Sequence, residues 1–319
     1  MFTNPNPLLV LLLGPTGSGK TALSLRLAQQ FHGEILSCDS VAVYCGMELG
    51  TAKPSPEERA QVPHHLLDMV NPTQAMTAGN WARAAREAAR LIAAKGCLPI
   101  VSGGTGLYLR AFTEGLAPLP PRCPAMRTRL IAAAQSHPPG YLHRMLQRLD
   151  LAAARRIHAN DQPKLIRALE VALLGGASTA SMMRDPLQGF QLLRIGLEPP
   201  RALLYERLNR RAAAMFTRGL VEETRALQQR YGADTPALGA LGYKEAAAVL
   251  RGAMTEGEAV AAAQQGHRNY AKRQMTWFRR EPDVHWLPGF GDAPEIAGEA
   301  AKLVAQQDSR AIHEKDPRN

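Results

Sequence analysis

The stretch that most constrains the fold of this chain is Gly14-Pro15-Thr16-Gly17-Ser18-Gly19-Lys20-Thr21. It follows the apolar run 8–13 and precedes the helix-like segment 22–28. A strand, a glycine-rich turn ending in Lys-Thr, and a helix together predict a loop whose backbone N–H groups bind phosphate. Lys20 would add a positive charge, and the Thr21 hydroxyl is placed to hold Mg²⁺. The motif predicts a phosphate compound but leaves open whether that compound is ATP.

Strand-like and helix-like segments alternate through the first third of the sequence. The runs 34–38 and 98–101 predict two further strands, and the alanine-rich segment 78–95 predicts a helix between them. This order predicts an α/β fold, a P-loop NTPase-like parallel sheet with helices on both faces. Ligands of such sheets bind at the carboxyl ends of the strands, where the loop 14–21, Asp39 and the segment 102–106 should meet.

A change of pattern near residue 115 predicts an inserted domain. A proline-rich segment is followed by a mostly helical, basic region, and the next strand-like run is 191–197. We therefore expect a core of residues 1–115 and 188–319, which includes C-terminal helices, and an inserted helical domain at 116–187. Residues 122–185 hold ten Lys or Arg and four Asp or Glu, so they supply +6 of the chain's net charge of +10. This indicates either a solvated basic surface or a surface for a polyanion, most simply nucleic acid.

Two polar positions follow the second and third expected strands. Asp39 would hold Mg²⁺, cap a helix, or position and deprotonate a second substrate. The third strand leads into Ser102-Gly103-Gly104-Thr105 and lacks the acid that P-loop ATPases often place there. The glycine pair suits close approach of a ligand, and Thr105 would either hydrogen-bond a leaving oxygen or cap a tight turn.

Cations recur at helical spacing later in the chain. Arg207, Arg210 and Arg211 would form a solvated stripe, or one of them would reach phosphates as they gain charge. The segments 238–245 and 268–280 combine cations with aromatic rings, which suits single-stranded RNA because unstacked bases lie on such rings. The alternative is that the rings belong to the core.

Composition argues against several other classes of protein. The sequence has no run of 18 apolar residues and no basic leader with a small-residue cleavage site, so we expect neither a membrane span nor a secretory signal. The four cysteines form no C-x-x-C pair, which argues against a disulfide framework and a zinc cluster. We therefore expect a cytoplasmic enzyme with no membrane contact.

Ordered motifs across residues 8–287 carry a resemblance to a known family. Gly-Thr-Ala-Lys-Pro at 50–54 and Lys-Arg-Gln-x-Thr-Trp at 272–277 are far more specific than the phosphate loop. The other motifs are Gly14–Thr21, Asp39-Ser40, Val43-Tyr44, Gly46-Met47, Pro63-His64-His65-Leu66, Gly103-Gly104-Thr105, Asn160-Asp161, Arg167–Val171 and Gly242-Tyr243-Lys244-Glu245. With these motifs the chain closely resembles bacterial tRNA dimethylallyltransferases, also called tRNA isopentenyltransferases.

The resemblance implies a reaction and the residues that perform it. A dimethylallyl group would pass from dimethylallyl pyrophosphate to N6 of adenosine at tRNA position 37, next to the anticodon, with Mg²⁺ as cofactor. The loop 14–21 would bind the pyrophosphate, and Asp39 would accept a proton from the adenine amine. Thr105 would contact the bridging oxygen, and Arg211 or a neighbouring arginine would neutralise pyrophosphate. The residues implied to face the tRNA anticodon stem-loop are Asp39, Ser40, Val41, Ala42, Thr105, Arg127, Pro163, Lys164, Leu165, Ile166, Arg167, Gly239, Ala240, Leu241, Gly242, Tyr243, Lys244, Lys272, Arg273, Gln274, Met275, Thr276, Trp277, Phe278 and Arg279. We expect the enzyme to act as a monomer.

Three other functions remain as alternatives at this point. A small P-loop kinase would use Asp39 to bind an acceptor and the insert as a lid. An RNA-binding NTPase switch would transfer no group. A prenyltransferase acting on free adenine nucleotides would not need the basic insert.

Overall fold

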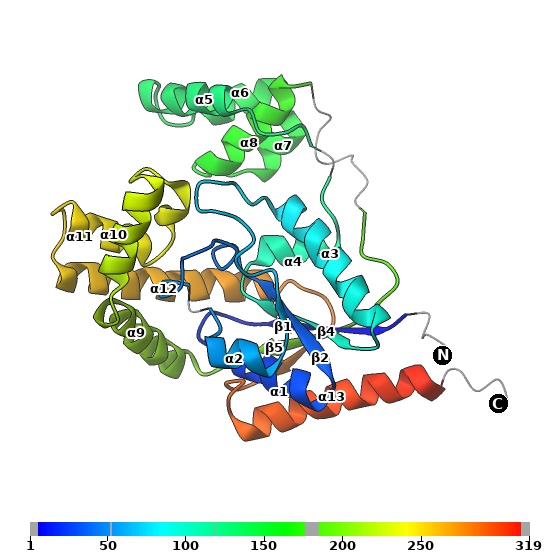
Figure 1. The fold of residues 1–319 in the computed structure, drawn as a ribbon. Coiled ribbons are helices and arrows are strands. Elements are labelled where there is room, and N and C mark those ends of the chain that lie inside the picture. The colour runs from blue at the N-terminus through cyan, green and yellow to red at the C-terminus, as the bar shows by residue number, and fades with distance from the viewer. Residues whose placement is uncertain (1–5, 52, 118, 176–184, 314–319) are drawn as a thin grey trace. The chain divides into compact units, whose positions relative to one another are not determined.

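The central element of the fold is a parallel sheet. The computed structural model describes residues 6–51, 53–117, 119–175 and 185–313, with side chains as far as residue 308. Within these residues six parallel strands form one sheet in the order β3-β2-β4-β1-β5-β6, which confirms the predicted fold class (Figure 1). The strands are β1 (Leu8–Leu13), β2 (Gly33–Cys38), β3 (His64–His65), β4 (Leu98–Gly103), β5 (Gln191–Leu197) and β6 (Val284–Leu287). Ala52, Pro118, residues 176–184 and both chain ends, which the expected motifs and domains include, lie outside the described residues.

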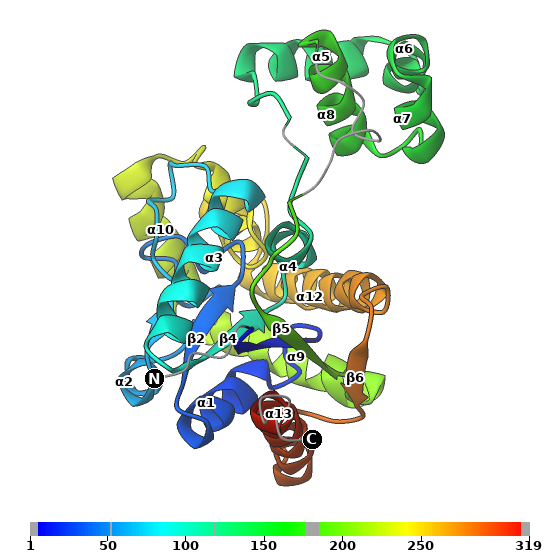
Figure 2. The ribbon, with the colours of Figure 1, turned by 90° about the vertical axis from the view of Figure 1, so that its right-hand side faces the viewer.

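Strand β1 is apolar along its whole length because helices cover both faces of the sheet. Alternate residues Leu8, Val10 and Leu12 pack with α1 (Lys20–Gln30) and α13 (Pro294–His313). Leu9, Leu11 and Leu13 pack on the other face with α3 (Ala78–Ala94) and α4 (Gly106–Thr113). Figures 1 and 2 show these two helix layers on opposite sides of the sheet. The continuous apolar run is therefore the signature of a central strand.

Residues at each end of helix α3 explain where the helix begins and ends. The Thr77 hydroxyl accepts a hydrogen bond from the Asn80 N–H at 3.1 Å and caps the start of the helix. Trp81 is fully buried and stacks on Tyr108 of α4, with ring centroids 4.9 Å apart. Gly96 follows the last turn with φ 77°, a left-handed conformation that glycine adopts without strain. The chain can therefore turn directly into β4.

The helices after β5 contribute to a further hydrophobic cluster in the same unit. It contains Met215 and Phe216 together with Tyr243 and the small residues Ala259 and Ala263. Small residues on α12 let α9 and α12 pack closely. These elements are α9 (Arg201–Thr217), α10 (Leu220–Tyr231), the 3₁₀ helix η1 (Pro236–Gly239), α11 (Tyr243–Leu250) and α12 (Glu256–Phe278), and the short α2 (Pro56–Gln61) lies earlier in the chain.

The chain divides into two compact units. The core unit comprises Met1–Thr113 and Leu187–Asn319, and the helical unit comprises Glu114–Pro186. The helical unit has its own core, which includes Leu130, Leu146 and Leu169. Its helices are α5 (Pro124–Ser136), α6 (Tyr141–Leu149), α7 (Leu151–Arg156) and α8 (Gln162–Leu173). None of the helices in the described part of the chain is both long and apolar enough to cross a membrane.

Candidate active site

The loop Gly14–Thr21 connects β1 to α1 at the carboxyl edge of the sheet. Gly14, Gly17 and Gly19 have φ angles of 141°, 81° and 88°, values that other residues rarely adopt. A Cβ at Gly19 would lie 2.5 Å from Asp292 Oδ1 and 2.7 Å from the Gly291 nitrogen. The glycines therefore allow the loop to turn, and the segment that joins β6 to α13 packs directly against Gly19.

Lys20 is enclosed by the loop that precedes it. Its Nζ donates hydrogen bonds to the carbonyl oxygens of Gly14 at 2.8 Å and Pro15 at 2.7 Å. Burial and the nearby Arg211 guanidinium lower the pKa of Lys20 to about 7, although Asp39 acts in the opposite direction. An anion in the loop would favour the charged ammonium, so the site is built to gain from binding phosphate.

Of the three candidate arginines, Arg211 is the one that the structure places at the loop. Its Nη2 donates to Thr16 Oγ1 at 2.6 Å. Arg207 instead pairs with Asp292 at 2.8 Å, and Arg210 is exposed. Burial lowers the pKa of Arg211 to about 10, with Asp39 raising it and Arg207 lowering it further, so the guanidinium is charged at neutral pH. Two enclosed cations thus converge on the loop.

Asp39 lies just after β2 and keeps one carboxylate oxygen available. Its Oδ1 accepts hydrogen bonds from the Val41 N–H at 2.7 Å and the Ala42 N–H at 3.1 Å. Its Oδ2 has no hydrogen bond to any described residue. The carboxylate raises the pKa of both Lys20 and Arg211, so it faces the same space as the two cations. A fixed carboxylate with a free oxygen beside an anion site is suited to proton acceptance.

Thr105 lies against the Asp39 turn because β2 and β4 are neighbours in the sheet. Its Oγ1 accepts a hydrogen bond from the Ser40 N–H at 3.0 Å and lies 3.3 Å from Ser40 Oγ. A Cβ at Gly103 would lie 2.1 Å from the Cys38 carbonyl oxygen, so only glycine allows this approach. The structure therefore brings the loop with Lys20, Asp39 and Thr105 together at the edge of the sheet, and Arg211 joins them from α9.

The helix α12 contributes two polar side chains that sequence analysis did not assign to the site. His267 is 5% exposed, and neither ring nitrogen has a partner among the described residues. Burial and then Arg211 lower its pKa to about 4, so the ring is neutral. Burial and then Asp39 raise the pKa of Tyr270 to about 12, so its hydroxyl stays protonated. The sequence could have indicated both residues, because their spacing places His267, Tyr270 and Gln274 on one face of the same helix.

Several residues expected to face tRNA are buried within the core unit. The Tyr243 ring is fully buried, and its hydroxyl donates to Glu223 Oε1 at 2.6 Å and accepts from the Gly50 N–H at 3.2 Å. Gln274 and Phe278 are also buried. Trp277 is half-buried, and the Arg110 guanidinium lies 4.5 Å from its ring centroid. The expected tRNA residues of this unit that are exposed are Gly239, Lys244, Lys272, Arg273, Thr276 and Arg279.

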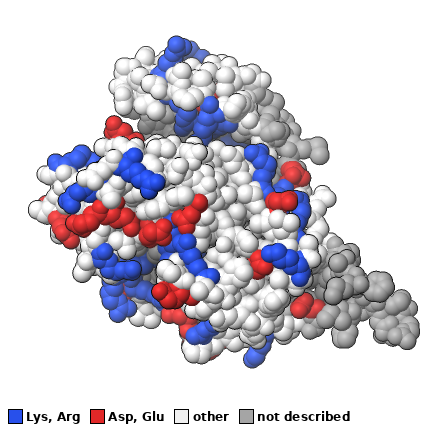
Figure 3. All heavy atoms as spheres, viewed as in Figure 1, with Lys and Arg blue, Asp and Glu red and all other residues white. Residues whose placement is uncertain are grey.

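In the helical unit two of the expected tRNA residues neutralise a buried acid. Arg127 Nη1 and Arg167 Nη1 donate to Glu170 Oε2 at 3.3 Å and 2.7 Å, and Glu170 is fully buried. Burial opposes ionisation, but the hydrogen bonds from Arg167 and the Cys123 N–H hold the pKa of Glu170 below its usual value. Leu165 and Ile166 belong to the core of this unit, and Pro163 and Lys164 are exposed. Figure 3 shows Lys and Arg side chains on the surface of this unit.

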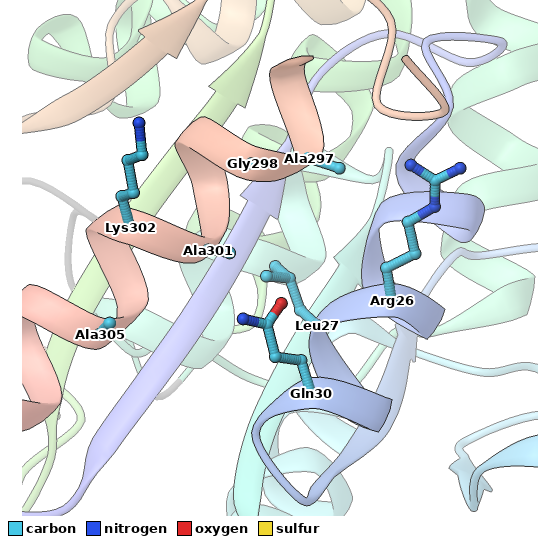
Figure 4. A pocket seen from close by; sticks show the side chains of 8 residues that line it. All are labelled: Arg26, Leu27, Gln30, Ala297, Gly298, Ala301, Lys302 and Ala305. Atoms are coloured by element: carbon cyan, nitrogen blue, oxygen red, sulfur yellow. The ribbon is translucent and has the colours of Figure 1, made fainter. Parts of the chain in front are cut away.

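A cavity elsewhere in the core unit lacks this chemistry. It has a volume of about 370 Å³ and lies between α1 and α13, with an apolar floor that includes Leu27 and Ala301 (Figure 4). Arg26 and Lys302 stand on opposite sides of it, and Gln30 points toward it. It contains no carboxylate or hydroxyl among its lining residues, so we place the candidate active site at the loop.

Known proteins resemble this chain in sequence and in fold. The family model described as IPP transferase matches residues 42–281. A tRNA dimethylallyltransferase from Koribacter versatilis (strain Ellin345) is 58% identical over 302 residues, which cover 94% of this chain and 98% of that protein. The crystal structure of a full-length tRNA isopentenylpyrophosphate transferase from Bacillus halodurans has a TM-score of 0.72 at 35% identity and covers 97% of this chain and 99% of that one. A eukaryotic dimethylallyltransferase acting on tRNA shares the fold, with a TM-score of 0.76 at 24% identity over 98% of this chain and 80% of that one. The chain belongs to the IPP transferase family.

Proposed function

We propose that this chain transfers a dimethylallyl group from dimethylallyl pyrophosphate to N6 of the adenosine at tRNA position 37, and releases pyrophosphate. The observation that carries the proposal is the free Oδ2 of Asp39 beside a glycine loop that encloses Lys20 and is contacted by Arg211. Membership of the family and the names of its relatives support the same reaction. The kinase alternative is not favoured by these comparisons.

In the proposed reaction the N6 amine attacks the allylic carbon, the new N–C bond forms, and the bond from that carbon to the bridging oxygen breaks. The amine is a weak nucleophile because its lone pair is delocalised into the adenine ring. Asp39 Oδ2 accepts the proton that the amine loses, a role that contributes about 10²–10⁴-fold. Lys20, Arg211 and the loop N–H groups stabilise the charge that develops on pyrophosphate, and Thr105 supplies a hydroxyl near the bridging oxygen.

Magnesium fits the donor set that the loop offers. The Thr21 hydroxyl is exposed in the first turn of α1. The described residues hold no group of three or more His, Cys, Asp or Glu side chains placed for a metal. Mg²⁺ is commonly held by one or two protein oxygens together with substrate phosphates, so Thr21 and the pyrophosphate oxygens are a suitable set. When bound, the ion would offset the charge of the leaving group.

We propose that exposed residues of both units contact the tRNA. The exposed cations Lys164, Lys272, Arg273 and Arg279 are suited to phosphate contacts. The adenosine must leave its stack to reach Asp39, which favours binding at a loop such as the anticodon loop. Monomeric action and a cytoplasmic location, where tRNA would be available, belong to the same proposal.

One assay tests the function. The protein is incubated with dimethylallyl pyrophosphate, Mg²⁺ and unmodified tRNA that carries adenosine at position 37, and the nucleosides are analysed by mass spectrometry. We expect N6-dimethylallyladenosine with tRNA as acceptor and none with AMP. ATP turnover without a prenylated nucleoside would overturn the proposal, and prenylated AMP would favour the free-nucleotide alternative.

A further inference from the structure

Helix α12 contacts the chain on both sides of Thr105. Gln274 is buried, and its Nε2 donates to the Gly104 carbonyl oxygen at 2.8 Å. A Cβ at Gly106 would lie 2.4 Å from the Trp277 ring, so this glycine lets the ring pack against the backbone. The residues immediately before and after Thr105 therefore both touch the helix, and packing fixes the distance between α12 and Thr105.

Tyr270 lies one turn before Gln274 on the same helix. Its hydroxyl faces the Thr105 hydroxyl closely enough for a side-chain hydrogen bond, and the Asp39 carboxylate is close enough to act on it. The Arg273 guanidinium lies 5.7 Å from the centroid of the Tyr270 ring, within the range of a cation–π interaction. The tyrosine is therefore held with its hydroxyl directed at Thr105.

The chemistry of the two hydroxyl groups sets the direction of this hydrogen bond. Burial and then Asp39 raise the pKa of Tyr270 to about 12, so its hydroxyl keeps its proton at neutral pH. A phenol is a better donor and a poorer acceptor than an aliphatic hydroxyl, because its oxygen lone pair is delocalised into the ring. Tyr270 is therefore suited to donate to Thr105 Oγ1.

Thr105 Oγ1 has one proton to donate and two lone pairs to accept with. The Ser40 N–H, which can only donate, occupies one lone pair at 3.0 Å, and Tyr270 occupies the second. The Thr105 proton then has Ser40 Oγ as its neighbour at 3.3 Å, which is longer than the range of about 2.5–3.0 Å usual for O–H···O hydrogen bonds. This weakly held proton is what Thr105 can offer to a ligand.

We propose that Tyr270 is a positioning residue for the transfer, because by donating to Thr105 it directs the Thr105 proton toward the bridging oxygen of the isoprenoid pyrophosphate. The inference rests on the proposed function, in which the bond from the allylic carbon to that oxygen breaks. The electron pair of the broken bond stays on the bridging oxygen, and Thr105 keeps its proton while its hydrogen bond to that oxygen strengthens. A hydroxyl that accepts a hydrogen bond becomes a better donor, so Tyr270 makes Thr105 more effective as the charge develops.

The test is a double-mutant cycle on the full chain that measures the single-turnover rate of transfer to unmodified tRNA. Tyr270→Phe removes only the hydroxyl, so we expect the rate to fall by about tenfold, the effect of one hydrogen bond. The dissociation constants of dimethylallyl pyrophosphate and tRNA should change by less than about twofold, because the hydrogen bond acts on the transition state. In Thr105→Ala, the same substitution should change the rate by less than about twofold, because the group through which Tyr270 acts is gone.

Two further measurements separate this role from packing and from an effect on the base. Tyr231→Phe on α10 is the matched control, since the Arg230 guanidinium lies 5.1 Å from the Tyr231 ring centroid and Tyr231 packs in the hydrophobic cluster of the helices after β5. It should leave the transfer rate unchanged. In a second cycle, the effects of Tyr270→Phe and Asp39→Asn on the rate should multiply independently. Thermal unfolding of each variant checks that it is folded.

Three results would overturn the inference. One is a normal transfer rate in Tyr270→Phe. The second is an equal fall in the unchanged and the Thr105→Ala chains, which is what a purely structural role produces. The third is an effect of Tyr270→Phe that disappears in Asp39→Asn, which would assign the hydroxyl to the base. Transfer by the unchanged protein tests the proposed function separately, since a lack of prenylated nucleoside there would reject the function itself.

Discussion

Asp39 is held by two backbone N–H groups through one oxygen, so the second oxygen can be tested without disturbing the turn. Asp39→Asn keeps an acceptor for the Val41 and Ala42 N–H groups but cannot take the amine proton. We expect kcat to fall by about 10²–10⁴-fold with little change in tRNA affinity. Single-turnover transfer and filter binding measure the two quantities, with the exposed Asp234→Asn as control. Near-normal turnover in Asp39→Asn would assign the base role to another group.

His267 predicts a pH dependence of stability. Burial and then Arg211 lower its pKa from the ordinary 6.5 to about 4 in the folded chain, so between these values the unfolded chain binds the proton and the folded chain does not. The free energy of unfolding should therefore fall as pH decreases from about 7 to 4, by about 3 kcal/mol from this residue. Urea unfolding at several pH values measures the slope, which His267→Phe should reduce. The same slope in His267→Phe as in the unchanged chain would mean that other groups cause it, and the exposed His285→Phe should leave it unaltered.

At the scale of single helices, Glu170 on α8 binds Arg127 of α5 and the Cys123 N–H that precedes α5, and it also pairs with Arg167 on its own helix. Removing one partner of a buried ion pair typically costs about 3–5 kcal/mol, because the remaining charges lose their compensation. We expect Glu170→Ala to destabilise the helical unit by about that amount. Hydrogen exchange of the α5–α8 amides measures it. Lys164→Ala removes the ion pair with Asp161 but keeps the Asp161 side chain that caps the start of α8, so it should cost about 1 kcal/mol or less; an equal loss in both variants would contradict the buried role of Glu170.

The strands that could be predicted from the sequence are those formed by strongly apolar runs. The runs that became β1, β2, β4 and β5 are apolar because neighbouring elements bury them. The strand β3 is only His64–His65, and β6 is only Val284–Leu287, and both lie at sheet edges. Edge strands this short carry no pattern of their own, because their pairing is decided by the strands beside them.

The same limit applies to the site. The sequence could predict which residues lie at the carboxyl edge of the sheet when they follow a recognisable strand. This holds for the loop glycines, Lys20, Asp39 and Thr105. Tyr243 could not be placed, because a ring next to a lysine looks the same whether it is exposed or, as here, buried against Glu223. The choice of Arg211 over Arg207 depends on Asp292, which lies 85 residues from Arg207. Such choices are made by tertiary contacts, not by local spacing.

At the scale of the whole molecule, the salt dependence of tRNA binding tests whether both units contact the same RNA. Lys164 in the helical unit and Lys272 in the core unit are exposed. If each contacts a phosphate, Lys164→Gln and Lys272→Gln should each reduce the slope of log K against log salt by about 0.7–0.9. Fluorescence anisotropy over a salt series measures the slope. Lys302→Gln on α13 is the control, and an unchanged slope in Lys164→Gln would remove that residue from the tRNA surface.

The contact between the Gly291 segment and the phosphate loop has a consequence for how the chain folds during its synthesis. The loop begins at residue 14, yet the Gly291 N–H donates to the Ser18 carbonyl oxygen at 2.9 Å, and β1 pairs with β5, which follows the helical unit in the chain. Synthesis of the chain must therefore reach residue 291 before the first motif of this sequence takes its final form. We expect nascent chains that stop short of residue 291 to lack this contact, so the order of synthesis delays the final form of the loop.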